Sequence, residues 1–176
     1  HPIPWAAISG TVADATEAGK LYAVTDSAFS QARILTIDAT DVPAVITAAV
    51  TVTKDGAPAA GLDLEGIALA GDGGFWLASE GDPEREENPT QSTLVRVDAT
   101  GAIVEEVSLP ESLQAVATRS GFEGVAVTGS GADETIWLAV QREWKDDPKG
   151  KVKILAYRPA DESWGVLHYP LDPAGT

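Results

Sequence analysis

Three stretches of this chain resemble one another, and this internal repeat constrains the fold more than any other feature of the sequence. Each stretch carries a glycine after a polar residue at the start of an apolar run, namely Gly10, Gly66 and Gly124. These glycines lie 56 and 58 residues apart. A repeat on this scale is typical of arrays built from one small structural unit. We therefore divide residues 1–176, taken as one domain, into three units, at about 5–55, 62–112 and 120–173.

Each unit contains four short runs of β-branched, aromatic and often alternating residues, which is the pattern of strands. The second runs, at 21–26, 75–80 and 136–141, have an aromatic residue second and a polar residue sixth. Turn sequences such as Asp55-Gly56 separate the runs. The pattern predicts an all-β fold, a β-propeller-type array of about three four-stranded antiparallel blades. The alternative is a β-sandwich, which has short strands but needs no four-strand repeat.

Three blades do not close a ring, because propellers usually have about 4–8 of them. The chain begins at His1 and contains no Met. We therefore expect a partial propeller, an excerpt of a longer protein. The remaining blades would come from the parent chain or from another copy of this one.

The composition excludes several classes of function. With 27 acidic residues against 12 basic ones and a net charge of −15, the chain repels phosphate backbones, so we expect no nucleic-acid partner. The sequence contains no run of about 18 apolar residues, so it predicts no membrane-spanning helix. The absence of Cys excludes disulfides, thiol nucleophiles and zinc–thiolate sites. His1 and His168 are poorly placed for acid–base work, and no Gly-x-Ser-x-Gly elbow or phosphate-binding glycine loop is present.

Acidic residues recur at equivalent places in the units. The term anchoring glycines is used below for Gly10, Gly66 and Gly124. Glu65 and Glu123 precede the second and third of them, and Ser9 precedes the first. In a propeller these positions face the central channel near one mouth. Carboxylates gathered there need a cation or a proton, and calcium suits a site of oxygen ligands. The alternative is that Glu-Gly forms a structural turn in which the glutamate caps free amides.

A second set of oxygens accompanies these glutamates. Asp26 and Glu80 end the second runs of their units, and Asp63 lies just before Glu65. The predicted metal ligands are thus Asp26, Asp63, Glu65, Glu80 and Glu123. The loop from Glu80 to Glu87 holds five acids but lacks the spacing of an EF-hand. We expect this loop to be solvated except for Glu80.

The basic residues gather in the third unit, where five of the twelve lie between Arg142 and Lys153. Arg142 and Lys145 follow the second run, beside the expected channel mouth, and we predict that they hold an anionic group. The alternative is a surface hairpin balanced by neighbouring acids. Lys149, Lys151 and Lys153 are expected at the surface.

Four tracts carry a resemblance to a known family. They are Asp63-Leu64-Glu65-Gly66-Ile67-Ala68, the run from Gly73 to Gly81, Gly121-Phe122-Glu123-Gly124-Val125-Ala126, and the run from Trp137 to Pro148. Together they resemble the phytase-like propeller family called "esterase-like activity of phytase", and Ser9 departs from its Glu-Gly pattern. The resemblance implies a secreted or periplasmic bacterial protein, longer than this chain. It also implies likeness to phytases that bind phosphate through calcium and acidic residues in the channel.

The residues and the resemblance together indicate a calcium-dependent hydrolase of phosphate or other esters, acting on a small anionic or ester substrate. Glu65, Glu123, Arg142 and Lys145 are its predicted catalytic residues. One alternative is a metal-dependent lactonase like the gluconolactonase propellers. Another is an extracellular propeller without enzymatic activity that binds a partner or acts as a scaffold.

Overall fold

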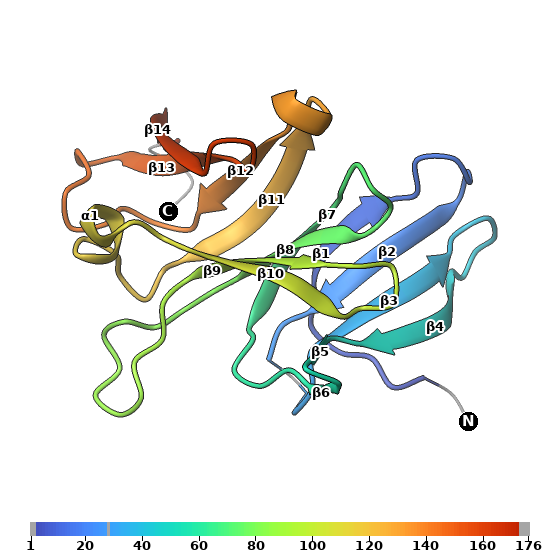
Figure 1. Ribbon diagram of the computed structural model, residues 1–176. Helices are drawn as coiled ribbons and strands as arrows, with labels where there is room; N and C mark the ends of the chain where they lie inside the picture. Colours follow the sequence, from blue (N-terminus) through green and yellow to red (C-terminus); the bar gives the residue numbers. More distant parts are fainter. Residues whose placement is uncertain (1–2, 28, 173–176) are drawn as a thin grey trace.

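The computed structural model describes residues 3–27 and 29–172, and within them the chain is almost entirely β-structure. Three antiparallel sheets of four strands follow one another along the chain, and none closes on itself (Figure 1). The all-β class and the four-stranded antiparallel units are thereby confirmed. His1 and Pro173, the last residue of the third predicted unit, lie outside the described residues.

In each sheet the strands are hydrogen-bonded in the order in which the chain makes them. The first sheet consists of β1 (Ile8–Ala13), β2 (Lys20–Thr25), β3 (Arg33–Asp38) and β4 (Val45–Thr51). The second consists of β7 (Leu64–Leu69), β8 (Phe75–Ser79), β9 (Thr93–Val97) and β10 (Ile103–Ser108). The third consists of β11 (Phe122–Thr128), β12 (Thr135–Val140), β13 (Lys151–Arg158) and β14 (Ser163–Pro170).

Short elements connect the sheets. A small hairpin of β5 (Thr53–Lys54) and β6 (Ala57–Pro58) joins the first sheet to the second. The helix α1 (Glu111–Gln114) joins the second to the third. A single 3-10 turn, η1 (Gly131–Asp133), lies between β11 and β12. No helix in the described part of the chain has the length and hydropathy needed to cross a membrane.

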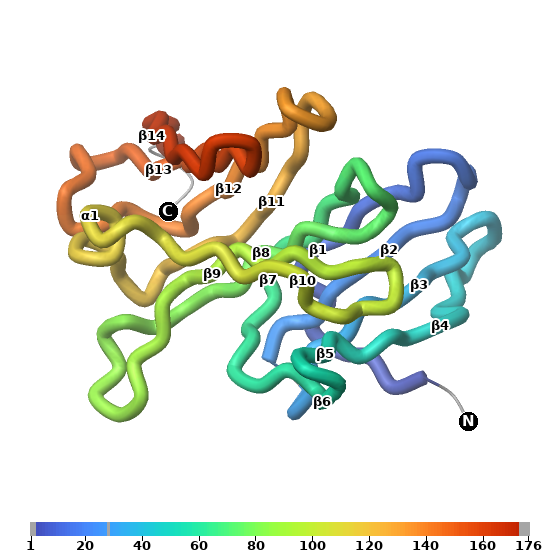
Figure 2. Tube along the Cα trace, in the orientation of Figure 1, coloured from blue at the N-terminus to red at the C-terminus, as the bar shows by residue number. Residues whose placement is uncertain are grey.

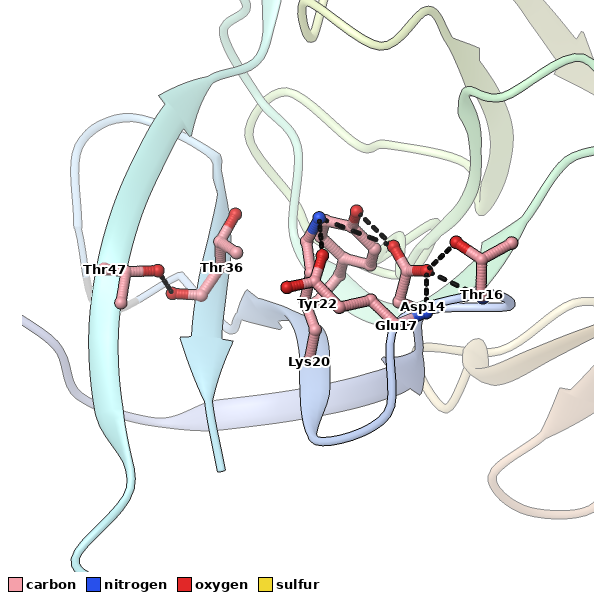
Figure 3. Close-up of polar contacts among 7 residues, drawn as sticks. All are labelled: Asp14, Thr16, Glu17, Lys20, Tyr22, Thr36 and Thr47. Atoms are coloured by element: carbon pink, nitrogen blue, oxygen red, sulfur yellow. Dashed lines mark hydrogen bonds and ion pairs between the residues drawn. The ribbon is translucent and has the colours of Figure 1, made fainter. Parts of the chain in front are cut away.

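Side-chain oxygens hold the hairpin turns. In the turn from β1 to β2, the Asp14 carboxylate accepts hydrogen bonds from the backbone N–H groups of Thr16 and Glu17, at 2.8 and 2.9 Å, and from the Tyr22 hydroxyl at 2.8 Å (Figure 3). The Lys20 ammonium lies 3.6 Å from the same carboxylate. These bonds, the one from Thr16 first, keep the pKa of Asp14 well below its usual range. The ionised Asp14 carboxylate therefore stabilises this turn.

The core lies between the sheets. One cluster, which includes Val24, Leu64 and Leu77, fills the space between the first and second sheets. Another, which includes Trp76 and Leu138, fills the space between the second and third. The middle sheet is thus buried on both faces, and the tube shows the chain passing through the three sheets in turn (Figure 2). Burial on both faces explains why β7 and β8 read as nearly continuous apolar runs.

The prediction that Lys153 lies at the surface is wrong. Its side chain is only 2% exposed, and its ammonium contacts Asp147 and lies 2.6 Å from Asp146. Lys153 shares one face of β13 with Leu155, a residue of the core. The two aspartates fold back over that face and supply the countercharge that a buried ammonium requires. Lys149 and Lys151 are exposed, as predicted.

Candidate functional site

The repeated polar residue before each glycine lies in a β-bulge. Strand pairing passes directly from Leu64 to Gly66 in β7 and from Phe122 to Gly124 in β11, which leaves Glu65 and Glu123 as extra, unpaired residues. The same irregularity in β1 involves Ser9. A bulge re-aims one side chain out of the alternating pattern of its strand. The repeat therefore presents one polar side chain per sheet at equivalent places.

The anchoring glycines bring these bulges together. A Cβ added to Gly10 would lie 2.8 Å from the Cα of Gly66, and one added to Gly66 would lie 2.8 Å from the backbone N of Val125. Real Cβ atoms do not approach other atoms so closely, so only glycine allows β1, β7 and β11 to stand this near one another. The glycines and the placement of the glutamates are thus two parts of one arrangement, which lies in bulges within strands and not in the structural turn that the alternative predicts.

The residues after the second strands form an equivalent layer. The backbone N–H groups of Asp26, Glu80 and Gln141 each donate to a carbonyl just before the first strand of the same sheet. Those carbonyls belong to Ala7, Asp63 and Gly121, at distances of 3.0, 2.7 and 3.0 Å respectively. The equivalence predicted from sequence is therefore present in the backbone hydrogen bonding.

Three carboxylates converge where the first two sheets meet. Asp26, Asp63 and Glu65 each place a carboxylate oxygen within 4.8 Å of the others. The Ser27 N–H donates to Asp63 Oδ1 at 3.0 Å, and the Ser9 hydroxyl donates to Glu65 Oε2. Asp26 comes from one sheet and the other two acids from the next. The packing between sheets, rather than proximity along the chain, assembles this group.

Glu80 and Glu123 enlarge the group, and the term acidic cluster is used below for Asp26, Asp63, Glu65, Glu80 and Glu123. Glu80 Oε1 accepts from the backbone N–H of Gly121 at 2.8 Å. Burial raises the pKa of Glu80 above its usual range, and the charge of Glu123 adds to the rise. For Glu123 itself, burial and then the charge of Glu65 raise the pKa. The structure thus brings Asp26, Asp63 and Glu65 within ligand distance of one another, while Glu80 and Glu123 lie close enough to interact with the group electrostatically.

The remaining carboxyls of the acidic cluster also have shifted pKa values. Burial raises the pKa of Glu65, although the hydrogen bond from Ser9 acts against the rise. Burial also raises the pKa of Asp63, and the neighbouring Asp26 raises it further. Hydrogen bonds from Ser27 and then from Asp63 lower the pKa of Asp26. Asp26 and Asp63 therefore titrate as a pair, in which Asp26 is the more acidic carboxyl.

These carboxylates offer a ligand set for a hard cation. All the donors are oxygens, three of them converge, and each raised pKa reflects a charge that is costly without a countercharge. No lysine or arginine forms an ion pair with the acidic cluster among the described residues. The group therefore needs either a cation or retained protons.

A cavity of about 820 Å³ adjoins the acidic cluster, with Asp63 and Glu80 in its wall. Three arginines, Arg85, Arg119 and Arg142, also line it. Arg85 lies 3.8 Å from Asp82, whereas Arg119 and Arg142 form no ion pair among the described residues. The cavity thus offers acidic oxygens on one part of its wall and guanidinium groups on another.

The structure places the two predicted anion-binding residues differently. Arg142 lines the cavity, one residue beyond Gln141. Lys145 does not line it, and its exposed ammonium lies 3.8 Å from Glu84 Oε1 in the acidic loop. Glu86 and Glu87 in that loop are exposed. Sequence reasoning missed Arg119, because it lies in a connection outside the repeated runs and only the packing of the sheets brings it to the cavity.

A family model described as "Phytase-like: Esterase-like activity of phytase" matches residues 3–176. Comparison with curated proteins and with solved structures gives no significant match. The resemblance seen in the Glu-Gly tracts is therefore confirmed over nearly the whole chain.

Proposed function

Because the chain belongs to the phytase-like family described as esterase-like activity of phytase, we propose that it is a calcium-dependent hydrolase of phosphate or other small anionic esters. The observation that carries this proposal is the acidic cluster beside a cavity lined by unpaired arginines. Cation-binding and anion-binding groups on one cavity wall suit a negatively charged ester. We place the protein outside the cytoplasm of a bacterium, secreted or periplasmic, on the strength of the family resemblance.

We further propose that the three sheets are blades of a β-propeller. Each is a four-stranded antiparallel meander, and their first strands stand side by side through the anchoring glycines. A propeller arranges its blades in this way around a central channel. The bulge residues would then face that channel, with the cavity at its mouth.

The cation would be held by Asp26, Asp63 and Glu65, with Glu80 and Glu123 as further oxygens within electrostatic reach. Bound calcium would neutralise the charge of the substrate and make a water molecule more acidic. Burial and the charge of Glu65 raise the pKa of Glu123, which lies outside the three-carboxylate group, and a raised pKa makes a carboxylate a better proton acceptor. We assign Glu123 the removal of the proton from the attacking water, and Glu65 the binding of the cation that makes this water acidic.

The arginines would bind and orient the anionic group. A guanidinium can donate two parallel hydrogen bonds to a phosphate or carboxylate. Arg142 has no competing ion pair among the described residues and lines the cavity. Lys145, beside the acidic loop, would attract the substrate at longer range.

The test is an assay with phosphate monoesters, carboxylic esters and lactones, each with calcium and with a chelator. We expect calcium-dependent ester hydrolysis, reduced at least about 100-fold by Glu65→Gln or Glu123→Gln. Glu111→Gln, in the exposed first turn of α1, is the matched control and should retain full activity. Turnover of lactones alone would favour the lactonase alternative. Inactivity toward every ester, with no calcium bound, would overturn the proposal and favour a binding module.

A further inference from the structure

The third sheet has an uncovered face that repeats, residue by residue, a buried face of the second sheet. In the second sheet, Gly66, Ala78, Leu94 and Val107 pair directly across the four strands, and they lie in one row. The corresponding row of the third sheet is Gly124, Ala139, Ile154 and Leu167. Beside these rows, the pair Ala68 and Trp76 corresponds to the pair Ala126 and Trp137.

These equivalent rows differ in what covers them. Ala78 and Leu94 are completely buried, and Trp76 is 2% exposed, because the third sheet packs against them. Ala126 and Ala139 are exposed, and Leu167 is 55% exposed. The term open face is used below for the uncovered set, Gly124, Ala126, Trp137, Ala139, Ile154, Ala156 and Leu167. None of these seven residues is charged, although the chain has a net charge of −15, and Arg158 follows on the same face of β13 at its end.

No close contact within the described part of the chain requires a glycine at position 124 of the open face. A Cβ on Gly10 or Gly66 would collide with the backbone of the next first strand at 2.8 Å. A Cβ on Gly124 would meet only the Ala139 side chain, at an ordinary 3.8 Å. The space beyond Gly124 thus corresponds to the place that a further first strand occupies at the other two glycines.

The chain also presents the surface that would complete this contact. The side of the first sheet that faces away from the second sheet is apolar, with Leu35 and Ile37 backed by Leu21 and Ile46. A hollow of about 470 Å³ on that side is lined by apolar groups that include Trp5, which is 63% exposed. In the second and third sheets the corresponding side packs against the preceding sheet.

We propose that two copies of this chain associate head to tail, with the open face of each copy covering the far side of the first sheet of the other. The contact continues the sheet-to-sheet packing already present twice within the chain. Two copies supply six sheets, a number within the range of about 4–8 that closes a ring. The first-strand bulge of the partner then follows that of β11, so both copies line one channel. The proposal rests on sheet packing and does not depend on hydrolase activity.

Sedimentation velocity and light scattering on the purified chain test the proposal. We expect a mass twice that of one chain at micromolar concentration. Ala139→Arg, at the centre of the open face, should weaken dimerisation more than about 30-fold, as central interface substitutions do. Gly124→Ala should also weaken it, because its Cβ would meet the partner strand. Ala160→Arg, in the exposed turn before β14, is the matched control and should remain dimeric.

Circular dichroism establishes that each variant is folded before its mass is interpreted. Because the chain has no Cys, Ala139→Cys provides a second measurement that adds little volume. This thiol should react with a maleimide much more slowly than the thiol of Ala160→Cys, and dilution to monomer should abolish the difference. A wild-type chain that stays monomeric at about 100 µM would overturn the proposal and leave another sheet as the occupant. Open-ended polymers, or a folded Ala139→Arg variant that remains dimeric, would overturn it as well.

Discussion

The carboxyl groups of this chain include two kinds, which differ in the direction in which the fold shifts their pKa values. The turn aspartates, such as Asp14 and Asp98, accept several local hydrogen bonds, which lower their pKa values. The acidic cluster instead gathers partly buried carboxyls whose pKa values are raised, except for that of Asp26. The first kind stabilises the fold as an anion, whereas the second kind carries a charge that the fold alone does not neutralise.

The raised pKa values predict a direction for the pH dependence of stability. A carboxyl whose pKa is higher in the folded state binds its proton more tightly there than in the unfolded state. Its contribution to the free energy of unfolding is therefore fully present below the unfolded-state pKa, and it is lost as pH rises through the folded-state pKa. Without metal, the melting temperature should therefore fall as the pH rises above the ordinary carboxyl range, through the raised pKa values of the acidic cluster. Calorimetry in a chelator measures this, and Glu65→Gln should flatten the dependence. A melting temperature that rises across the same range would contradict the account.

Asp147 is a charged residue outside the acidic cluster whose loss should destabilise the fold strongly. Its buried carboxylate accepts a hydrogen bond from the backbone N–H of Trp144 at 2.7 Å, contacts the Lys153 ammonium and lies 2.8 Å from His168 Nε2. Asp147→Ala removes one of the two carboxylates beside the buried Lys153 ammonium, and we expect it to destabilise the fold by about 3 kcal/mol. Chemical denaturation measures the change. Asp133→Ala, at an exposed acid in η1, is the control and should change stability by less than about 0.5 kcal/mol.

At the scale of strands and sheets, the anchoring glycines determine how closely the sheets approach. Gly66→Ala would place a Cβ 2.8 Å from the backbone of Val125, and backbone atoms cannot yield as a flexible side chain does. The substitution should cost at least about 2–3 kcal/mol by forcing β7 and β11 apart. Gly165→Ala is the matched control, because its Cβ would make an ordinary contact of 3.7 Å with Ala156. Equal denaturation midpoints for the two variants would refute this role of Gly66.

The repeat allows the strands and their order to be predicted. Each strand is recognised by the alternation of its own residues, and each turn by residues such as Gly and Asp. It also allows Asp26, Glu65, Glu80 and Glu123 to be selected, because equivalent places in a repeat occupy equivalent places in space, whereas Asp63 is selected only because it lies just before Glu65. The convergence of Asp26 on Asp63 and Glu65 depends on how one sheet packs on the next. No local pattern encodes that contact.

The same limit explains what sequence reasoning missed. Lys153 is buried because the segment after β12 folds back over β13, and a lysine among charged neighbours reads as a surface residue. Arg96 is 6% exposed, contacts Asp72 and lies 5.5 Å from the Trp76 ring centre, on the same face of β9 as the buried Leu94. The burial of Arg96 is explained by contacts with residues that are distant along the chain, and that of Lys153 by the fold of the segment just before β13.

At the scale of the whole molecule, the fold is a row of three sheets with cores between them and apolar faces at both ends. The acidic cluster draws its side chains from all three sheets, so its geometry depends on the packing of the entire row. A cation bound there would tie the sheets together. Calcium should therefore stabilise the whole chain, by an amount that grows with its free concentration.

Titration calorimetry with calcium at neutral pH tests the central claim, that the acidic cluster is a cation site, most directly. The account predicts saturable binding, with a dissociation constant of about 10⁻⁵–10⁻³ M, that Glu65→Gln weakens at least about tenfold. Glu111→Gln should bind as the wild-type chain does. Absence of binding up to about 10 mM calcium, or binding that Glu65→Gln and Asp63→Asn leave unchanged, would contradict it.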